Sequence, residues 1–239
     1  MLELRTQYQK QIEELSETSK RMAALGYVSS HGGNISYRVA EDVVLITPTK
    51  VPKRKIEFND VCIINMKGEV LYAAPGRKPT GETPFHLRIY QQRPDVTGIV
   101  HGHPPVMTGF AIAHTDLLEK PLLPEPCMEV GPMLMVPYGE PLSQQLAENF
   151  DSVIHKANGF LMKNHGALMV SSEGVERALD FLEIMENTAI SALVAKLLGG
   201  CDLIPREEVG NIDRTIATRN LPMPGLPGTY SSLLDAFKE

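Results

Sequence analysis

The chain of 239 residues has no tryptophan and only three cysteines, Cys62, Cys127 and Cys201. Their odd number and wide spacing, without a C-x-x-C pair, argue against a disulfide framework or a thiolate metal site. No apolar run reaches membrane-spanning length, and the opening MLELRTQYQK contains no apolar signal-peptide core. We therefore expect a cytoplasmic protein with free thiols that does not enter a membrane.

An excess of positive charge is also missing. The formal net charge is −6, and acidic and basic residues are interspersed along the chain. Without a basic stripe, and without aromatic residues between basic ones, a nucleic-acid partner is not expected. A hydrophobic content of 43% at this length allows one large domain with a full core.

Apolar periodicity predicts a mixture of helices and short strands. Long amphipathic helices are expected from Leu4 to Leu25, before Gly26, and from Glu173 to Leu198. The other predicted elements are strands at 34–38, 43–46, 61–65, 70–72, 96–101 and 133–138, an apolar run at 159–162, and helices at 84–92, 106–113 and 141–156. Short strands linked by hairpins and mixed with helices indicate an α+β layered domain. We assign it to residues 1–219, and residues 220–239, rich in proline and glycine, to an extended, mobile tail.

The most informative motif is a pair of histidines in GIVHGHPP, His101 and His103. Residues i and i+2 of a strand project from the same face, so both imidazoles point the same way at the end of one predicted strand. A third histidine, His165, follows another apolar run in GFLMKNHGALMV. A short motif of this kind often occurs by chance, but three converging imidazoles form a three-ligand metal site with an open position.

An acidic residue lies one predicted helix upstream of the histidine pair. Thr83 and Pro84 are good residues for the start of a helix, which places Glu82 just before its N-terminus. A carboxylate in that position can serve the metal as a ligand, a base, or both. His86 lies within the same predicted helix, and we assign it to packing or to a hydrogen bond beside the site rather than to metal ligation.

Five separated motifs in the same order give the chain a recognisable pattern. They are HGGNISYR, LITPTK, KPTGETPFHLRIYQQRPDVTGIVHGHPP, VPYGEP and FLMKNHGALM. With them the chain resembles the class II aldolase/adducin family over roughly the first four-fifths of its length, most closely the L-fuculose-1-phosphate aldolase branch. The resemblance implies a central, mostly antiparallel sheet between helix layers, and a homotetramer with active sites at subunit interfaces.

The resemblance also implies roles for individual residues. It implies a zinc ion held by the three histidines, with manganese or cobalt as possible substitutes, and a catalytic role for Glu82. The phosphate-binding loops of the family fall on Asn34, on Thr49 and Lys50, and on Thr80 and Gly81. Tyr138 in VPYGEP matches a family tyrosine that can reach a neighbouring subunit's site, and it is a candidate proton donor.

Three of the motifs depart from the usual family pattern. Many relatives have Ser or Thr before GGN, where this chain has His31, and relatives often have TPTG and SSE, where this chain has TPTK and TGE. Gly81 lacks a hydroxyl that commonly binds phosphate, and Lys50 adds a cation nearby. We expect a pocket of changed shape that still binds an anionic substrate, with Lys50 as a point charge. Tyr230 in the tail could close over the site, as tail tyrosines do in relatives.

The expected activity is therefore that of a zinc-dependent aldolase, which cleaves a ketose, phosphorylated or not, to an enediolate-derived ketone and an aldehyde. The same fold supports epimerisation, decarboxylation and dehydration in relatives, so these three reactions also stay open. Glu82, where the epimerase branch is expected to have aspartate, favours aldol cleavage. A non-enzymatic, adducin-like scaffold is disfavoured because adducin head domains lack the histidine set.

Overall fold

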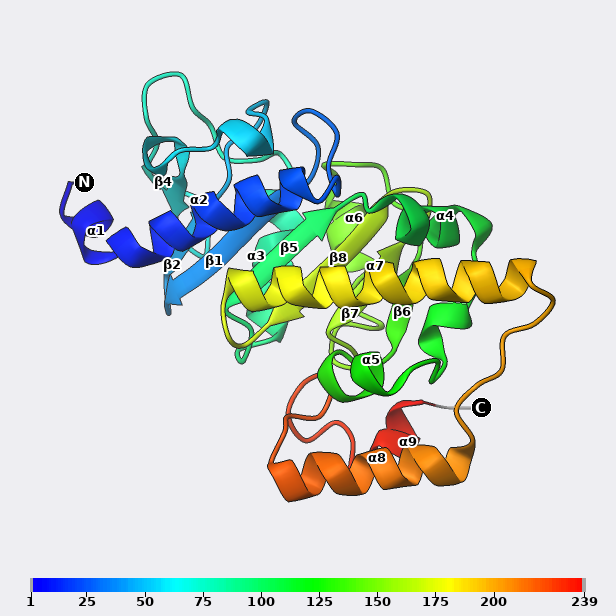
Figure 1. Cartoon of the computed structure of the whole chain (residues 1–239). Coiled ribbons are helices and arrows are strands. Elements are labelled where there is room, and N and C mark those ends of the chain that lie inside the picture. Colours follow the sequence, from blue (N-terminus) through cyan, green and yellow to red (C-terminus); the bar gives the residue numbers. More distant parts are fainter. Residues whose placement is uncertain (1, 238–239) are drawn as a thin grey trace.

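The structure is a computed structural model that describes residues 2–237. Its centre is an eight-stranded sheet in the order β4-β3-β2-β1-β5-β8-β7-β6 (Figure 1). The strands are β1 (Asn34–Ala40), β2 (Val43–Ile46), β3 (Cys62–Ile64), β4 (Val70–Tyr72), β5 (Gly98–Gly102), β6 (Met133–Val136), β7 (Gly159–Met162) and β8 (Gly166–Ser171). All neighbours pair antiparallel except β6 and β7, which pair parallel. The predicted α+β fold with a mostly antiparallel sheet is confirmed.

Helices cover both faces of this sheet. The helices of the described chain are α1 (Leu2–Gln7), α2 (Gln9–Ala24), α3 (Thr83–Gln92), α4 (Pro105–Ala113), α5 (Pro124–Glu129), α6 (Gln144–Glu148), α7 (Val175–Leu197), α8 (Arg206–Arg219) and α9 (Leu233–Ala236), with 3-10 turns η1 (Lys53–Lys55), η2 (Phe58–Asp60) and η3 (Leu117–Glu119). Helices α2, α4 and α7 pack on one face, and α3 and α6 on the other (Figure 1). None of the helices in residues 2–237 combines the length and apolar character needed to cross a bilayer.

The two cores explain why the central strands are apolar on both sides. Every residue of β5 is buried; Ile99 joins the core under α3, and Val100 the core under α2 and α7. Such a strand has no polar face, because side chains alternate between two covered faces. The sheet is thereby held between two helix layers. The last residues of β5, a central strand, therefore have a fixed position at one end of the strands.

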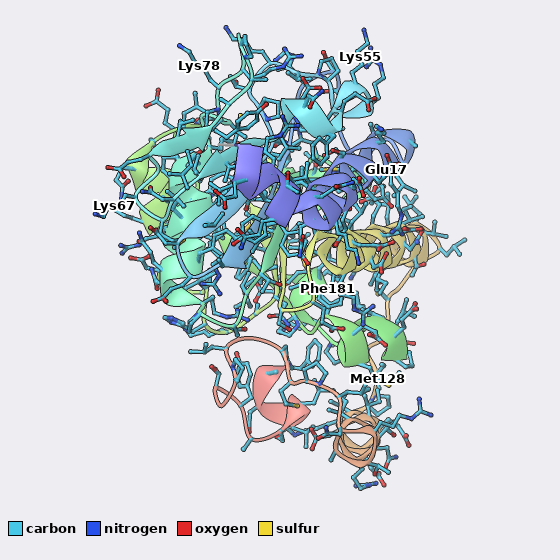
Figure 2. All side chains as sticks on the ribbon, turned by 90° about the vertical axis from the view of Figure 1, so that its left-hand side faces the viewer. Glu17, Lys55, Lys67, Lys78, Met128 and Phe181 are labelled. Carbon is cyan, nitrogen blue, oxygen red and sulfur yellow. The ribbon has the colours of Figure 1, made fainter. Side chains whose placement is uncertain are left out.

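The C-terminal part forms a third, smaller cluster. Helices α8 and α9 pack against Cys127 of α5, and Figure 2 shows α5, near Met128, between them and the main body. The segment predicted to be extended and mobile is folded here: Leu233 and Phe237 are buried, and the Tyr230 hydroxyl donates to the Lys156 carbonyl at 3.0 Å. Closure of Tyr230 over the histidine site would have to break that hydrogen bond, and such closure stays a prediction.

Some element boundaries differ from the predicted ones. The expected helix at 141–156 is helical only over α6, and tight turns follow. Within those turns the Asn149 amide bonds the carbonyls of Pro137 and Tyr138, and Asp151 pairs with Arg88 of α3. These contacts with other segments compete with continuation of the helix. Strand β8 and helix α8 were not predicted.

Candidate active site

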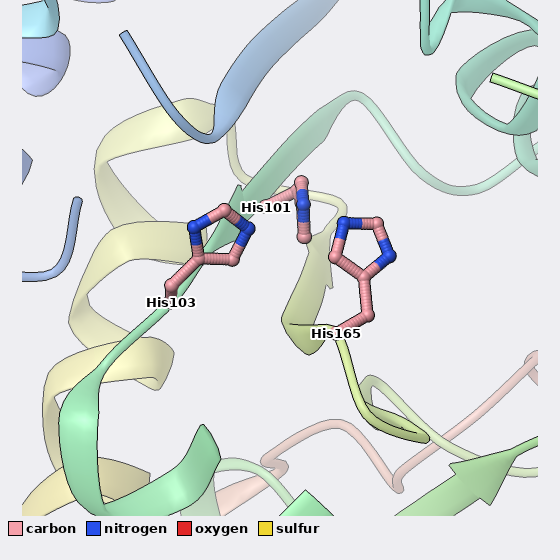
Figure 3. Close-up of side chains that lie close together, drawn as sticks. All are labelled: His101, His103 and His165. Carbon is pink, nitrogen blue, oxygen red and sulfur yellow. The ribbon is translucent and has the colours of Figure 1, made fainter. Parts of the chain in front are cut away.

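The three histidines meet at one end of the sheet. His101 is in β5 and His103 follows it, while His165 occupies the turn between β7 and β8. One ring nitrogen of each lies within 4.8 Å of the others, and Figure 3 shows the rings turned toward a common space. Gly166 permits this approach, because a Cβ there would stand 2.6 Å from the His103 ring and 2.4 Å from the Gly102 carbonyl oxygen. The turn therefore packs directly on the histidine strand.

One ring nitrogen of each histidine in this cluster is buried without a hydrogen-bond partner among the described residues. His101 Nδ1 lies 3.0 Å from the Ala167 carbonyl, which can only accept, so Nδ1 carries the proton and Nε2 offers a lone pair. His101 Nε2 and His103 Nε2 are buried without a hydrogen bond to any described residue. An unpaired buried nitrogen normally costs stability. Buried lone pairs from several imidazoles fit a divalent cation, with the backbone carbonyl fixing one tautomer as at known metal sites.

The electrostatics of the cluster favour neutral rings. Burial lowers the pKa of His101 well below its ordinary value, and positive charge on His165 or His103 would lower it further. Burial, followed by the charges of His165 and Lys53, lowers the pKa of His103 to about 4. Burial also lowers the pKa of His165, against the opposing effect of Glu82. At neutral pH the rings are therefore unprotonated, the state that binds metal.

Glu82 lies beside two of these rings. It immediately precedes α3 and is 8% exposed. Its Oε2 lies 3.5 Å from His101 Nε2, and its Oε1 lies 3.4 Å from His165 Nε2. The structure thus brings the predicted carboxylate and the predicted histidines into one group, in which Glu82 and His101 are buried and His103 and His165 are half-buried. Such a carboxylate is placed either to complete a metal shell or to exchange a proton with a bound molecule.

Asn34 and His86 form the wall behind Glu82. The Asn34 amide donates to Glu82 Oε2 at 2.6 Å, and its oxygen faces His86 Nε2 at 2.5 Å. Both ends of the amide are therefore engaged within the protein. This changes our expectation for Asn34, because its side chain is 2% exposed and is not free to bind phosphate in this structure. His86, as expected, is outside the ligand cluster and makes hydrogen bonds beside it.

The two loops expected to hold an anion lie side by side. Thr49 donates its backbone N–H to the Lys78 carbonyl at 2.9 Å, and Thr80 donates to the Thr47 carbonyl at 3.0 Å. Thr80 Oγ1 accepts the Glu82 N–H at 3.3 Å, so this loop is continuous with the carboxylate. Lys50 is exposed and has a left-handed φ of 60°. The Thr80 segment is therefore next to Glu82, and the Thr49 segment pairs with it.

Comparison with known proteins shows to which family the chain belongs. The family model described as Class II Aldolase and Adducin N-terminal domain matches residues 13–193. The chain belongs to this family. A 3-oxo-tetronate 4-phosphate decarboxylase of Haemophilus influenzae is 32% identical over 169 residues, covering 69% of this chain and 78% of that protein. A 5-deoxy-D-ribulose 1-phosphate aldolase of Bacillus thuringiensis is 30% identical over 207 residues, covering 85% and 94%.

Solved structures support the same fold assignment. The chain superposes on an L-fuculose 1-phosphate aldolase with a TM-score of 0.77, covering 87% of this chain and 96% of that one, at 23% identity. The likeness to this solved structure supports the fold, and the family model supports membership of the class II aldolase and adducin family. Its members among the relatives include aldolases and a decarboxylase, so membership alone leaves the specific reaction open.

One residue near the site was missed by sequence reasoning. Lys53, in the run KVPKRK, has the pattern of a solvated loop but is 1% exposed. Its ammonium donates to the carbonyls of His31, at 3.2 Å, and Val51, at 3.5 Å. Burial lowers the pKa of Lys53 to about 8, against the opposing charge of Glu82, and its charge acts on His103 in turn. Lys53 is therefore a buried cation within electrostatic reach of the cluster.

Proposed function

We propose that this protein is a zinc-dependent lyase that breaks a carbon–carbon bond beside the ketone of a phosphorylated ketose and releases an aldehyde. The observation that supports this most directly is the meeting of three buried or half-buried imidazoles and one buried carboxylate. A divalent cation held by His101, His103 and His165 would supply a Lewis acid for a substrate carbonyl. Manganese or cobalt would also suit these donors.

The residues around that position have two protons to move. Cleavage leaves an electron pair on the carbon beside the carbonyl, and this carbon must gain a proton. We assign that transfer to Glu82, which lies against the histidines and would first take up the proton from solvent. The hydroxyl that becomes the aldehyde must lose a proton, and we assign this second transfer to Tyr138, which would pass that proton on to solvent. Asn34 holds the carboxylate, and the loops at 47–50 and 78–81 face the anionic end of the substrate.

Decarboxylation is the second candidate, favoured by the Haemophilus influenzae relative. Loss of carbon dioxide from a 3-oxo acid leaves the same electron pair for Glu82, but no hydroxyl has to be deprotonated. The two reactions are separated by offering ketose 1-phosphates and a 3-oxo-tetronate 4-phosphate to the metal-loaded protein and measuring aldehyde and carbon dioxide. Aldehyde release that is lost in Tyr138→Phe supports the aldolase. Release of carbon dioxide without aldehyde would indicate a decarboxylase in place of the aldolase. An epimeric product would indicate an epimerase, and loss of water would indicate a dehydratase.

Tyr138 also provides a test of assembly. In a single chain its side chain is 55% exposed, which suits a residue that completes the site of a neighbouring subunit in a homotetramer. Tyr138→Phe and Glu82→Gln should each be inactive alone. After subunit exchange, mixed oligomers should regain about a quarter of the sites by random pairing of intact residues. Verified mixed oligomers without activity would place Tyr138 in its own subunit's site or outside catalysis.

Two lysines, Lys53 and Lys50, are candidates for binding the anionic end of the substrate. Lys53→Met should raise KM for a phosphorylated ketose about 10- to 100-fold, because a buried cation loses less strength to solvent than an exposed one. Lys50→Met, at an exposed position, should have a smaller effect of the same kind. In the unsubstituted protein KM should also rise as pH increases through about 8, where Lys53 loses its proton. The Lys53→Met variant should lack that rise.

The matched control is an uncharged analogue of the same ketose. The KM for this analogue should change little in either variant, because the analogue has no charge for a lysine to bind. A lysine whose replacement affects the charged and the uncharged substrate equally has no role in recognising the anion. If both variants change KM equally for the charged and the uncharged substrate, the assignment of a phosphorylated substrate is contradicted.

A further inference from the structure

A buried chain of hydrogen bonds runs from Glu82, between α3 and β1, to Tyr90 near the C-terminal end of α3. Glu82 Oε2 accepts from the Asn34 amide at 2.6 Å, and the Asn34 oxygen lies 2.5 Å from His86 Nε2. His86 Nδ1 lies 2.7 Å from Ser36 Oγ, which lies 2.9 Å from the Tyr90 hydroxyl. The side chains behind Glu82 belong to residues at most 2% exposed. Water therefore cannot replace any of these partners.

The charge of Glu82 sets the direction of the hydrogen bonds between Glu82 and Ser36. A carboxylate only accepts, so the Asn34 NH₂ must face Glu82 and the Asn34 oxygen must face His86. His86 Nε2 then has to carry the ring proton, which leaves Nδ1 to accept from the Ser36 hydroxyl. Complete burial lowers the pKa of His86 to about 3, so the ring stays neutral. With both its nitrogens engaged, the ring has one tautomer and one orientation.

The two oxygens of Glu82 are consequently different. Oε2 receives the Asn34 hydrogen bond, which reduces its basicity, whereas Oε1 receives none from the residues that the structure describes. Oε1 lies on the His165 side of the carboxylate, 3.4 Å from Nε2. We propose that His86 is a positioning residue that fixes Glu82 through Asn34 and leaves Oε1 as the oxygen that exchanges the substrate proton. This rests on the lyase function proposed above.

A double-mutant cycle on the metal-loaded protein tests this. His86→Leu and Asn34→Leu should each lower kcat about 10- to 100-fold, as expected for loss of a hydrogen bond to a charged group, with KM and metal content near wild type. Because His86 acts through Asn34, the double variant should be no slower than Asn34→Leu alone. His86→Gln, which can still present an N–H to Asn34, should recover most of the lost kcat.

Several results would overturn the inference. Additive losses in the double variant would show that His86 and Asn34 act independently. Equal kcat in His86→Gln and His86→Leu, with both folded, would reduce His86 to a packing residue. The same follows if His86→Leu turns over at the wild-type rate.

A second measurement does not depend on the reaction. Nitrogen NMR of the full chain labelled at histidine should show His86 protonated at Nε2 and bare at Nδ1, and Ser36→Ala should perturb the Nδ1 signal. A His86 ring protonated at Nδ1 would reverse the direction of these hydrogen bonds and refute the positioning role. If the wild-type protein cleaves none of the substrates offered, the proposed function fails while the tautomer result stands. If it cleaves them and the cycle is additive, only the positioning role fails.

Discussion

Replacing His101 and His103 together by alanine should abolish stoichiometric metal binding. Zinc sites with four ligands have apparent binding free energies of about 10–16 kcal/mol, or roughly 3 kcal/mol per ligand, so losing two ligands weakens binding on the order of 10⁴-fold. Protein purified without chelator should carry one metal per subunit, and the double variant almost none. Elemental analysis of both proteins, at matched concentration, measures this directly.

The control uses a histidine that is not one of the three proposed ligands. His114 is exposed and left-handed, and it lies 2.9 Å from Asn164 Oδ1. His114→Asn keeps a residue that tolerates this backbone and should retain full metal. A chelator should lower the melting temperature of the wild type and of His114→Asn but not of the double variant, since only a bound ligand stabilises the folded state. Full metal in the double variant would refute the three-histidine assignment.

The parts of the site that the sequence predicts best are those set by local geometry. The H-x-H spacing on a strand places two imidazoles on one face regardless of what surrounds them. The structure starts this strand at Gly98 rather than at residue 96, but His101 and His103 keep the expected relation. The position of Glu82 just before α3 could also be predicted from neighbouring residues, because Thr83 and Pro84 mark the start of a helix.

The parts that sequence reasoning missed depend on distant segments. Lys53 is buried because the loop carrying His31 covers it, and nothing in KVPKRK encodes that contact. The engagement of Asn34 by Glu82 and His86 likewise joins residues about fifty positions apart. Strand β8 has no polar face, so it lacks the alternation by which a half-buried strand is found. Helix α8 differs, because Pro205 and the acidic first turn were available signals.

The family resemblance and the structure inform different parts of the function. The comparisons narrow the reaction to the chemistry of a family that includes aldolases and a decarboxylase. The structure supplies a candidate for the proton transfer, because Glu82 is the one carboxylate in contact with His101 and His165 among the described residues. Protonation of the carbon beside the carbonyl is common to both reactions. A variant of Glu82 therefore tests the shared step without deciding between them.

Glu82→Gln should retain metal and lose turnover. Glutamine keeps the shape of the side chain, can still accept the Asn34 N–H, and leaves all three imidazoles in place. It cannot take up and return a proton, and removal of a general base typically lowers the rate about 10²- to 10⁴-fold. Solvent-deuterium exchange into the ketone fragment should fall in parallel with kcat, whether the leaving group is an aldehyde or carbon dioxide. Near-normal exchange would exclude Glu82 as the proton carrier, and loss of metal with retained folding would make it chiefly a ligand.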